Sequence, residues 1–146
     1  MFVGCDVKHN FSVLIAAFLI VNIACSCIKP VSYNEDKKIA DEATRMFHNL
    51  LDDERYEDLY ALTAEEARAT KSKDVFIFIM RMVRTNFGKA QKITLIESKI
   101  VRRAGFTEVH LSYRTEYEKS DHPEDFVWYV KENKASLFSY HTDKIE

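Results

Sequence analysis

The most reactive side chains of this chain of 146 residues are three cysteines, and all of them lie within its first 27 residues. Cys5 stands alone, whereas Cys25 and Cys27 are separated only by Ser26 and follow an uncharged, apolar run. A zinc or redox site is disfavoured, because the pair is too tightly spaced for the usual motifs and no histidine lies beside it. The cysteines therefore bear on how the N-terminus is processed and not on catalysis.

The apolar run from Phe11 to Ala24 has the pattern of a secretory leader, which combines a positively charged start, a short apolar stretch and small residues before the cleavage site. Lys8 and the terminal amine supply the positive charge. The stretch is shorter than the ~20 residues that a membrane-spanning helix needs. We therefore expect a cleaved leader; the alternative is an uncleaved anchor in which the cysteines act as small apolar residues.

The segment that ends at Cys27 resembles the lipobox of bacterial lipoproteins, in which small or apolar residues precede an acylated cysteine. Four such residues come before it: Ile23, Ala24, Cys25 and Ser26. Cys25 is the alternative attachment site, but Asn22 then falls where the family has a small or apolar residue. The resemblance implies a signal peptide over residues 1–26 and a diacylglycerol and palmitate-type anchor on Cys27. Because Ile28 follows in place of an aspartate, it also implies the outer membrane, with the domain facing the periplasm.

The histidines and the overall charge point to no metal, cofactor or nucleic acid. His48 lies beside an apolar helical stripe, His110 on a polar strand face, His122 in an expected turn and His141 near the C-terminus. None has metal-ligand spacing to another ligand, so a packed or solvated role is favoured for each. The net charge is −2 with both signs interspersed, which argues against a nucleic-acid surface.

Three helices are expected in the first half of the domain, which we place at residues 35–146 after a tether over 27–34. The apolar spacing predicts one helix from about Glu35 to Leu51 and a short one over Tyr56–Leu62. The last runs over Asp74–Phe87, from a cap at Ser72 or Asp74 to Gly88. Its wide apolar stripe, which includes Val75, Phe78 and Met82, is expected to pack against a sheet. Before it, Thr63 and Glu66 form a capping-box pattern over residues 64–69.

From Lys92 onward the apolar residues recur every second position, which predicts four strands. The expected strands are Ile93–Arg103, Phe106–Glu118, Phe126–Lys131 and Ala135–His141, with turns at 104–105, 120–124 and 132–134. In the second strand one face is apolar and the other charged, as in a sheet with one buried face. Helices gathered on one face of a four-stranded antiparallel meander make an α+β fold.

This order of elements resembles the nuclear transport factor 2-like, or cystatin-like, superfamily, and within it small exported bacterial proteins of unknown function. The resemblance rests on FHNLLDDERYEDLYALT (47–63), VRTNFGKA (83–90), HLSYRTEYEK (110–119) and LFSYH (137–141). It implies that the curved sheet and helices form a cone whose mouth holds a small apolar ligand. It also implies that homodimers through the open sheet face are possible.

Some members of the superfamily resemble ketosteroid isomerase and place an acidic base and a tyrosine inside the cone. A carboxyl group on an apolar strand face would be the signature, because burial raises its pKa into a useful range. We find none on the inward face of the second strand. In the first strand Glu97 is expected to share a face with Ile93 and Leu95, but Lys99 follows on that face, so an ion pair at the strand end is the better explanation. The sequence thus predicts a non-catalytic, lipid-anchored envelope protein that binds a small apolar ligand or a protein partner.

Two alternatives to this function remain open. In the first, the protein is a cone-pocket enzyme that uses Glu97 as base and Tyr113 or Tyr117 as hydrogen-bond donor. In the second, it is an uncleaved bitopic component of an envelope assembly. The aromatic residues of the sheet are expected to be core, and Tyr113, Tyr117 and Trp128 are those that could line a ligand pocket.

Overall fold

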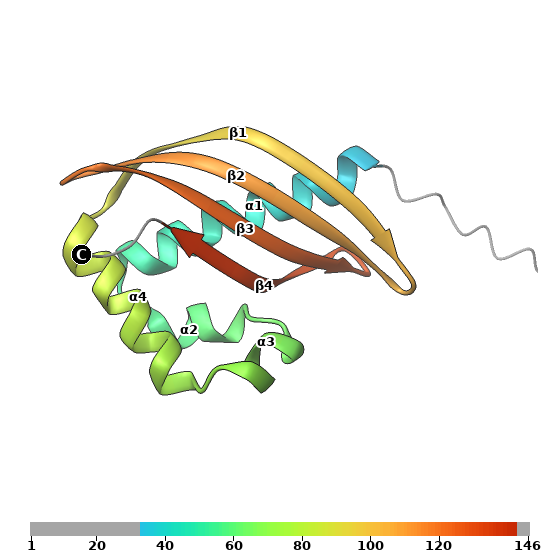
Figure 1. The fold of residues 1–146 in the computed structure, drawn as a ribbon, viewed down its shortest axis with the longest axis horizontal. Coiled ribbons are helices and arrows are strands. Elements are labelled where there is room, and N and C mark those ends of the chain that lie inside the picture. The colour runs from blue at the N-terminus through green and yellow to red at the C-terminus, as the bar shows by residue number, and fades with distance from the viewer. Residues whose placement is uncertain (1–32, 143–146) are drawn as a thin grey trace, which may run out of the picture.

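The computed structural model describes residues 33–142, which form an α+β domain with an open sheet (Figure 1). The elements follow one another as α1 (Tyr33–Asp52), α2 (Tyr56–Ala61), α3 (Glu65–Thr70), α4 (Lys73–Phe87), β1 (Ala90–Arg103), β2 (Phe106–Tyr117), β3 (Asp121–Lys131) and β4 (Lys134–Thr142). The predicted α+β class and the four-stranded antiparallel meander are confirmed. The expected leader and cysteines lie outside the described residues, and so does the tether as far as residue 32. Residues 33 and 34, which were expected to belong to the tether, form the first positions of α1.

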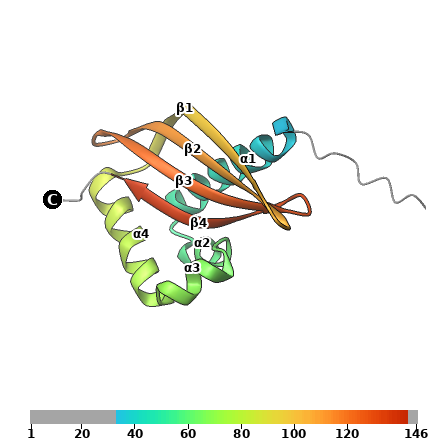
Figure 2. The same ribbon diagram turned by 45° about the vertical axis from the view of Figure 1, so that its right-hand side comes forward.

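The sheet has the order β1-β2-β3-β4 with antiparallel neighbours, and it curves over α1 (Figures 1 and 2). Helix α1 crosses beneath the sheet and contacts all four strands. The turn of Ala104 and Gly105 joins β1 to β2, and Glu132 and Asn133 adopt the positive φ angles of a two-residue hairpin between β3 and β4. Both turns were predicted from the sequence.

Four helices precede the sheet where three were expected. The additional helix is α3, which begins after Ala64 without any side-chain cap, so the predicted capping box of Thr63 is wrong. The hydroxyl of Thr63 instead donates to the carbonyl of Tyr60 and accepts from Nε of Arg68. Thr63 does not cap α3 because its backbone is held in a strand-like position. The segment between α2 and α3 forms a parallel bridge to Leu137 of β4.

Helix α4 has the predicted boundaries but not the predicted packing. Ser72 accepts a hydrogen bond from the amide of Val75 at the N-terminus, and Gly88 ends the helix at φ 85°. The residues that α4 buries are Phe76, Met80, Val83 and Phe87. Val75, Phe78 and Met82 are exposed, so the expectation that the whole apolar stripe packs inward is wrong. The helix is apolar on two faces, and only one of them meets the domain.

Strand β3 begins five residues earlier than predicted. The segment around Pro123, expected to be a turn, is part of the strand and pairs with β2. Within residues 33–142, β4 pairs with β3 only as far as Glu124, so the first residues of β3 pair there with β2 alone, where a proline without an N–H is tolerated. The consequence is that Glu124 lies within a strand, on its buried face.

A bulge in β1 changes which side chains face the core. The register shifts between Leu95 and Glu97, which places Ile96 out of step with β2. Glu97 then pairs with Ser112 on the outer face and is exposed, so the prediction that it shares a face with Ile93 and Leu95 is wrong.

The core lies between α1, α4 and the inner face of the sheet. Its largest fully buried side chains include Phe47 of α1, Tyr113 of β2, and Phe126 and Trp128 of β3. The predicted inward face of β2 is confirmed, with Val109, Leu111, Tyr113, Thr115 and Tyr117 all buried. Between residues 33 and 142, no helix has both the length and the apolar character needed to span a membrane.

Candidate functional site

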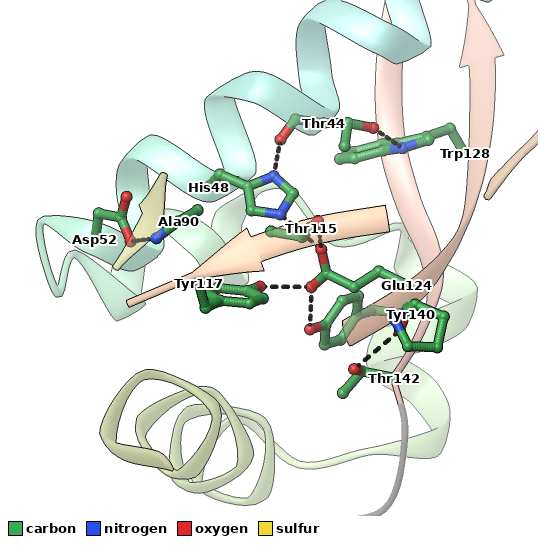
Figure 3. A network of polar contacts seen from close by, with 11 residues as sticks. Thr44, His48, Asp52, Ala90, Thr115, Tyr117, Glu124, Trp128, Tyr140 and Thr142 are labelled. Carbon is green, nitrogen blue, oxygen red and sulfur yellow. Dashed lines mark hydrogen bonds and ion pairs between the residues drawn. The ribbon is translucent and has the colours of Figure 1, made fainter. Parts of the chain in front are cut away.

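A cluster of polar side chains surrounds a fully buried carboxylate, that of Glu124 on β3 (Figure 3). Its Oε1 accepts the hydroxyls of Tyr117 and Tyr140, both at 2.6 Å. Its Oε2 accepts Nε2 of His48 at 2.9 Å and also the hydroxyl of Thr115. A carboxylate offers about four lone-pair positions, so these four donors satisfy it completely.

His48 on α1 is held in its charged form by two acceptors. Nδ1 lies 2.9 Å from the carbonyl oxygen of Thr44, which can only accept, and Nε2 faces the carboxylate. Burial lowers the pKa of His48, but the hydrogen bond and charge of Glu124 outweigh it, and the pKa is raised overall. Burial raises the pKa of Glu124. The hydrogen bond and charge of His48 and the hydroxyls of Thr115 and Tyr117 lower it by more, so the pKa is lowered overall. The pair is therefore an imidazolium and a carboxylate at neutral pH.

The tyrosines of the cluster are kept neutral by the same surroundings. Burial and the negative charge of Glu124 raise the pKa of both Tyr117 and Tyr140. Hydrogen bonds also tie α1 to the sheet beyond the carboxylate: Nε1 of Trp128 donates to the hydroxyl of Thr44 at 2.9 Å. The hydroxyl of Tyr113 donates to Asp41 at 2.5 Å. The cluster thus fixes α1 across the inner face of the sheet.

A separate pocket of about 80 Å³ lies between α3, α4 and β4. Its apolar lining comes mainly from four side chains: Phe76, Ile79, Met80 and Leu137. Polar groups also line it: Thr63, Arg68, Thr70, Lys71 and Ser139. The Arg68 guanidinium donates to Thr63 and to the carbonyl of Ala61. The Lys71 ammonium has no side-chain partner within residues 33–142. The volume is about half that of a ~150 Å³ cavity known to hold a benzene ring, so it suits a short alkyl chain or the edge of a ring.

Tyr140 connects the two regions. Tyr140 is one of the residues that line the pocket, and its hydroxyl donates to Glu124 inside the cluster. The pocket and the buried carboxylate are therefore neighbours through this residue.

The residues singled out by the sequence as pocket lining lie elsewhere. Tyr113, Tyr117 and Trp128 are buried in the core, and none of them lines the pocket between α3, α4 and β4. Glu97, the candidate base, is exposed on the outer face of β1. The structure therefore does not bring Glu97 together with Tyr113 or Tyr117.

Sequence reasoning missed Glu124 and assigned no partner to His48. A signal for Glu124 was present: Phe126, Trp128 and Val130 occupy every second position, and the same period extends back to Glu124. Pro123 hid it by suggesting a turn. For His48, its place beside the apolar stripe of α1 indicated burial, but not a partner that lies far along the chain.

Two of the other described histidines, His110 and His122, contact neighbouring side chains. His110 lies 2.6 Å from Oε1 of Glu108 on the outer face, and His122 stacks on Phe87 with ring centroids 3.6 Å apart. Within residues 33–142, no group of three or more histidine, cysteine or acidic side chains is arranged to hold a metal ion.

Comparison with models of protein families gives no match, and comparison with curated proteins gives no similar sequence. The class that fold and site define is thus an α+β domain with a buried ion pair and a small apolar pocket.

Proposed function

We propose that this protein is a non-catalytic binding domain of the nuclear transport factor 2-like type, held at a bacterial cell envelope by a lipid. It accepts the apolar part of a small ligand in the pocket between α3, α4 and β4. The observation that carries this proposal is the apolar lining of that pocket, formed by Phe76, Ile79, Met80 and Leu137. Burial of a short chain or the edge of a ring there removes apolar surface from water, which is the main source of affinity.

The state of Glu124 favours binding over catalysis. A general base needs a free lone pair within reach of the proton that it removes. All four acceptor positions of Glu124 are occupied by the protein itself, and Glu124 is not among the residues that line the pocket. Its pKa is lowered, whereas a base tuned for neutral pH has a raised one. The carboxylate is suited to hold the fold together.

Pocket binding is tested with a neutral probe, 4-fluorobenzyl alcohol, observed by ¹⁹F NMR in the presence of the purified chain. Ala67 on α3 lines the pocket, so Ala67→Phe is expected to fill it and abolish the exchange broadening of the probe signal. Ala69→Phe is the matched control, because Ala69 is on the same helix but exposed and outside the pocket. Equal binding by the two variants would contradict the proposal.

The lipid anchor is supported by the sequence before Cys27, and it is tested separately. We expect an alkyne-bearing palmitate analogue to label the full chain in bacterial cells, and Cys27→Ser to abolish the label while Cys25→Ser preserves it. Mass analysis of the N-terminus should then give a mature chain that starts at Cys27. Retention in the membrane without any label would instead support an uncleaved, bitopic protein.

A further inference from the structure

Helix α4 carries a second apolar stripe on the face that points away from the domain. Val75, Phe78 and Met82 are 49%, 64% and 36% exposed, and their spacing of three and four residues places them on one side of the helix. The opposite side is the buried one, formed by Phe76, Met80, Val83 and Phe87. An apolar helix face is normally covered, and a helix with two such faces is normally covered on both. The outward stripe therefore has the character of an interface.

Two charged residues beside the stripe are placed so that they would complement each other across a twofold axis. Asp74 and Arg81 are seven residues apart and lie along the same flank of α4, with Phe78 between them. Val75 and Met82 are also seven residues apart and lie on either side of Phe78. Both pairs are thus centred close to Phe78. Asp74 makes the N-terminal end of the stripe acidic, and Arg81 makes its C-terminal end basic.

We propose that α4 pairs with α4 of a second copy of this chain, antiparallel and with the twofold axis at Phe78. Phe78 then packs on Phe78 of the second copy, and Val75 packs on Met82. In this arrangement residues of the same flank face each other, so Asp74 meets Arg81 of the second copy twice over. In a parallel pairing, the flank with Asp74 and Arg81 would face the opposite flank of the second helix, and both ion pairs would be lost. Charge complementarity therefore selects a second copy and its orientation.

Both charges are available for such contacts. Asp74 and Arg81 are exposed, and neither forms an ion pair within residues 33–142. The Arg81 guanidinium lies over the ring of Tyr56, 5.4 Å from its centroid, and this contact leaves its hydrogen-bond donors free at the edge.

The interface is small, and this fixes its expected strength. Two helical turns bury less than the roughly 1,200 Å² of a stable interface, so the pair is weak and depends on concentration. Attachment of both copies to one membrane, as proposed above, would raise their local concentration and favour pairing.

Cysteine cross-linking in membranes tests the contact with the full chain. Phe78→Cys places a thiol on the proposed axis, and mild oxidation should convert it to a covalent dimer. Met46→Cys is the control, because Met46 is 52% exposed but lies on α1. The unsubstituted chain gives the background from Cys5, Cys25 and Cys27. A yield at Phe78→Cys no higher than that of the control, or an adduct with another protein, would overturn the proposal.

Charge exchange tests the orientation, with self-association of the full chain measured by analytical ultracentrifugation in density-matched detergent. Asp74→Arg and Arg81→Asp, each alone, should weaken self-association roughly threefold to tenfold, because like charges then face each other. The two single variants mixed together, and the double variant, should both recover it. Trp128 fluorescence confirms that each variant is folded. Failure of the double variant to recover while remaining folded would refute the antiparallel arrangement.

Discussion

The polar cluster around Glu124 and the pocket beside α3 share one residue, Tyr140, yet their physical characters are opposite. In the cluster every acceptor of a buried carboxylate is filled by the protein, and the charge is balanced by His48. In the pocket, apolar side chains surround an open space, and Lys71 at its edge has no side-chain partner within residues 33–142. The hydrogen-bonding groups of the cluster are all paired, whereas the pocket has space for a ligand.

The difference shows that buried charge in a fold is not by itself a sign of a reactive site. An ion pair in a low-dielectric interior is costly unless hydrogen bonds satisfy all of its remaining donors and acceptors. Once they are satisfied, nothing remains for a substrate. We therefore expect changes in the cluster to act on stability and changes in the pocket to act on binding.

The largest effect is expected from His48→Ala, which leaves the carboxylate of Glu124 buried without its counter-charge. Removal of one partner of a buried pair costs about 3–5 kcal/mol in the free energy of unfolding. Urea unfolding followed by the fluorescence of Trp128, the single tryptophan, measures this loss. Glu124→Gln breaks the same pair from the other side and should cost a comparable amount, because its amide nitrogen cannot accept the hydrogen bonds that a carboxylate oxygen takes. A loss below about 1 kcal/mol for His48→Ala would contradict the pairing.

A smaller loss is expected from Tyr140→Phe, which removes one hydroxyl from Glu124 and leaves the ring in the pocket wall. Hydrogen bonds to charged groups contribute about 1.5–3 kcal/mol. Binding of 4-fluorobenzyl alcohol should remain as in the unsubstituted protein, because the lining is unchanged in shape. A variant that lost binding without losing stability would show that the hydroxyl serves the pocket and not the cluster.

Much of this fold follows from local patterns in the sequence. The meander is predictable because β2 alternates cleanly and because the turns at Gly105 and Asn133 carry residues suited to positive φ. Helix α4 has a serine cap and a terminal glycine, which fix both of its ends. Where two local signals agree on a boundary, the prediction is correct.

The cluster could not be predicted in the same way, because it depends on contacts between distant segments. His48 and Glu124 are 76 residues apart, and only the crossing of α1 under the sheet brings them together. The bulge at Ile96 turns Glu97 outward, and bulges leave no clear mark in a strand pattern. The outer stripe of α4 was also missed, since an apolar residue gives no sign of which neighbour covers it.

The pH dependence of stability is expected to report on the cluster and to be absent from the pocket. The pKa of His48 is raised above its ordinary value of 6.5, so its contribution is complete below pH 6.5 and is lost as the pH rises through the folded value. The pKa of Glu124 is lowered from 4.5, so its contribution is complete above pH 4.5 and is lost as the pH falls through the folded value. Both contributions are complete between these two values.

Each unit by which the folded pKa of His48 exceeds 6.5 corresponds to about 1.4 kcal/mol of stability lost on the alkaline side. Asp52 also acts on His48 through its negative charge, and the tyrosines of the cluster titrate well above this range. Urea unfolding between pH 5 and 9 should therefore show a decline that His48→Gln removes. A decline of equal size in the variant would assign it to other groups.

The smallest effect on stability is expected from Ala67→Phe, although it has the largest expected effect on binding. Ala67 is half-buried at the pocket, where an added ring has space to enter and displaces no hydrogen bond. We expect a change in the free energy of unfolding within about 0.5 kcal/mol, as at most sites away from the core. A loss of several kcal/mol would mean that the space between α3, α4 and β4 is as tightly closed as the cluster. The contrast between a fully hydrogen-bonded cluster and an open pocket would then be wrong. This contrast requires that Ala67→Phe leave stability unchanged or slightly raised and abolish binding of the probe.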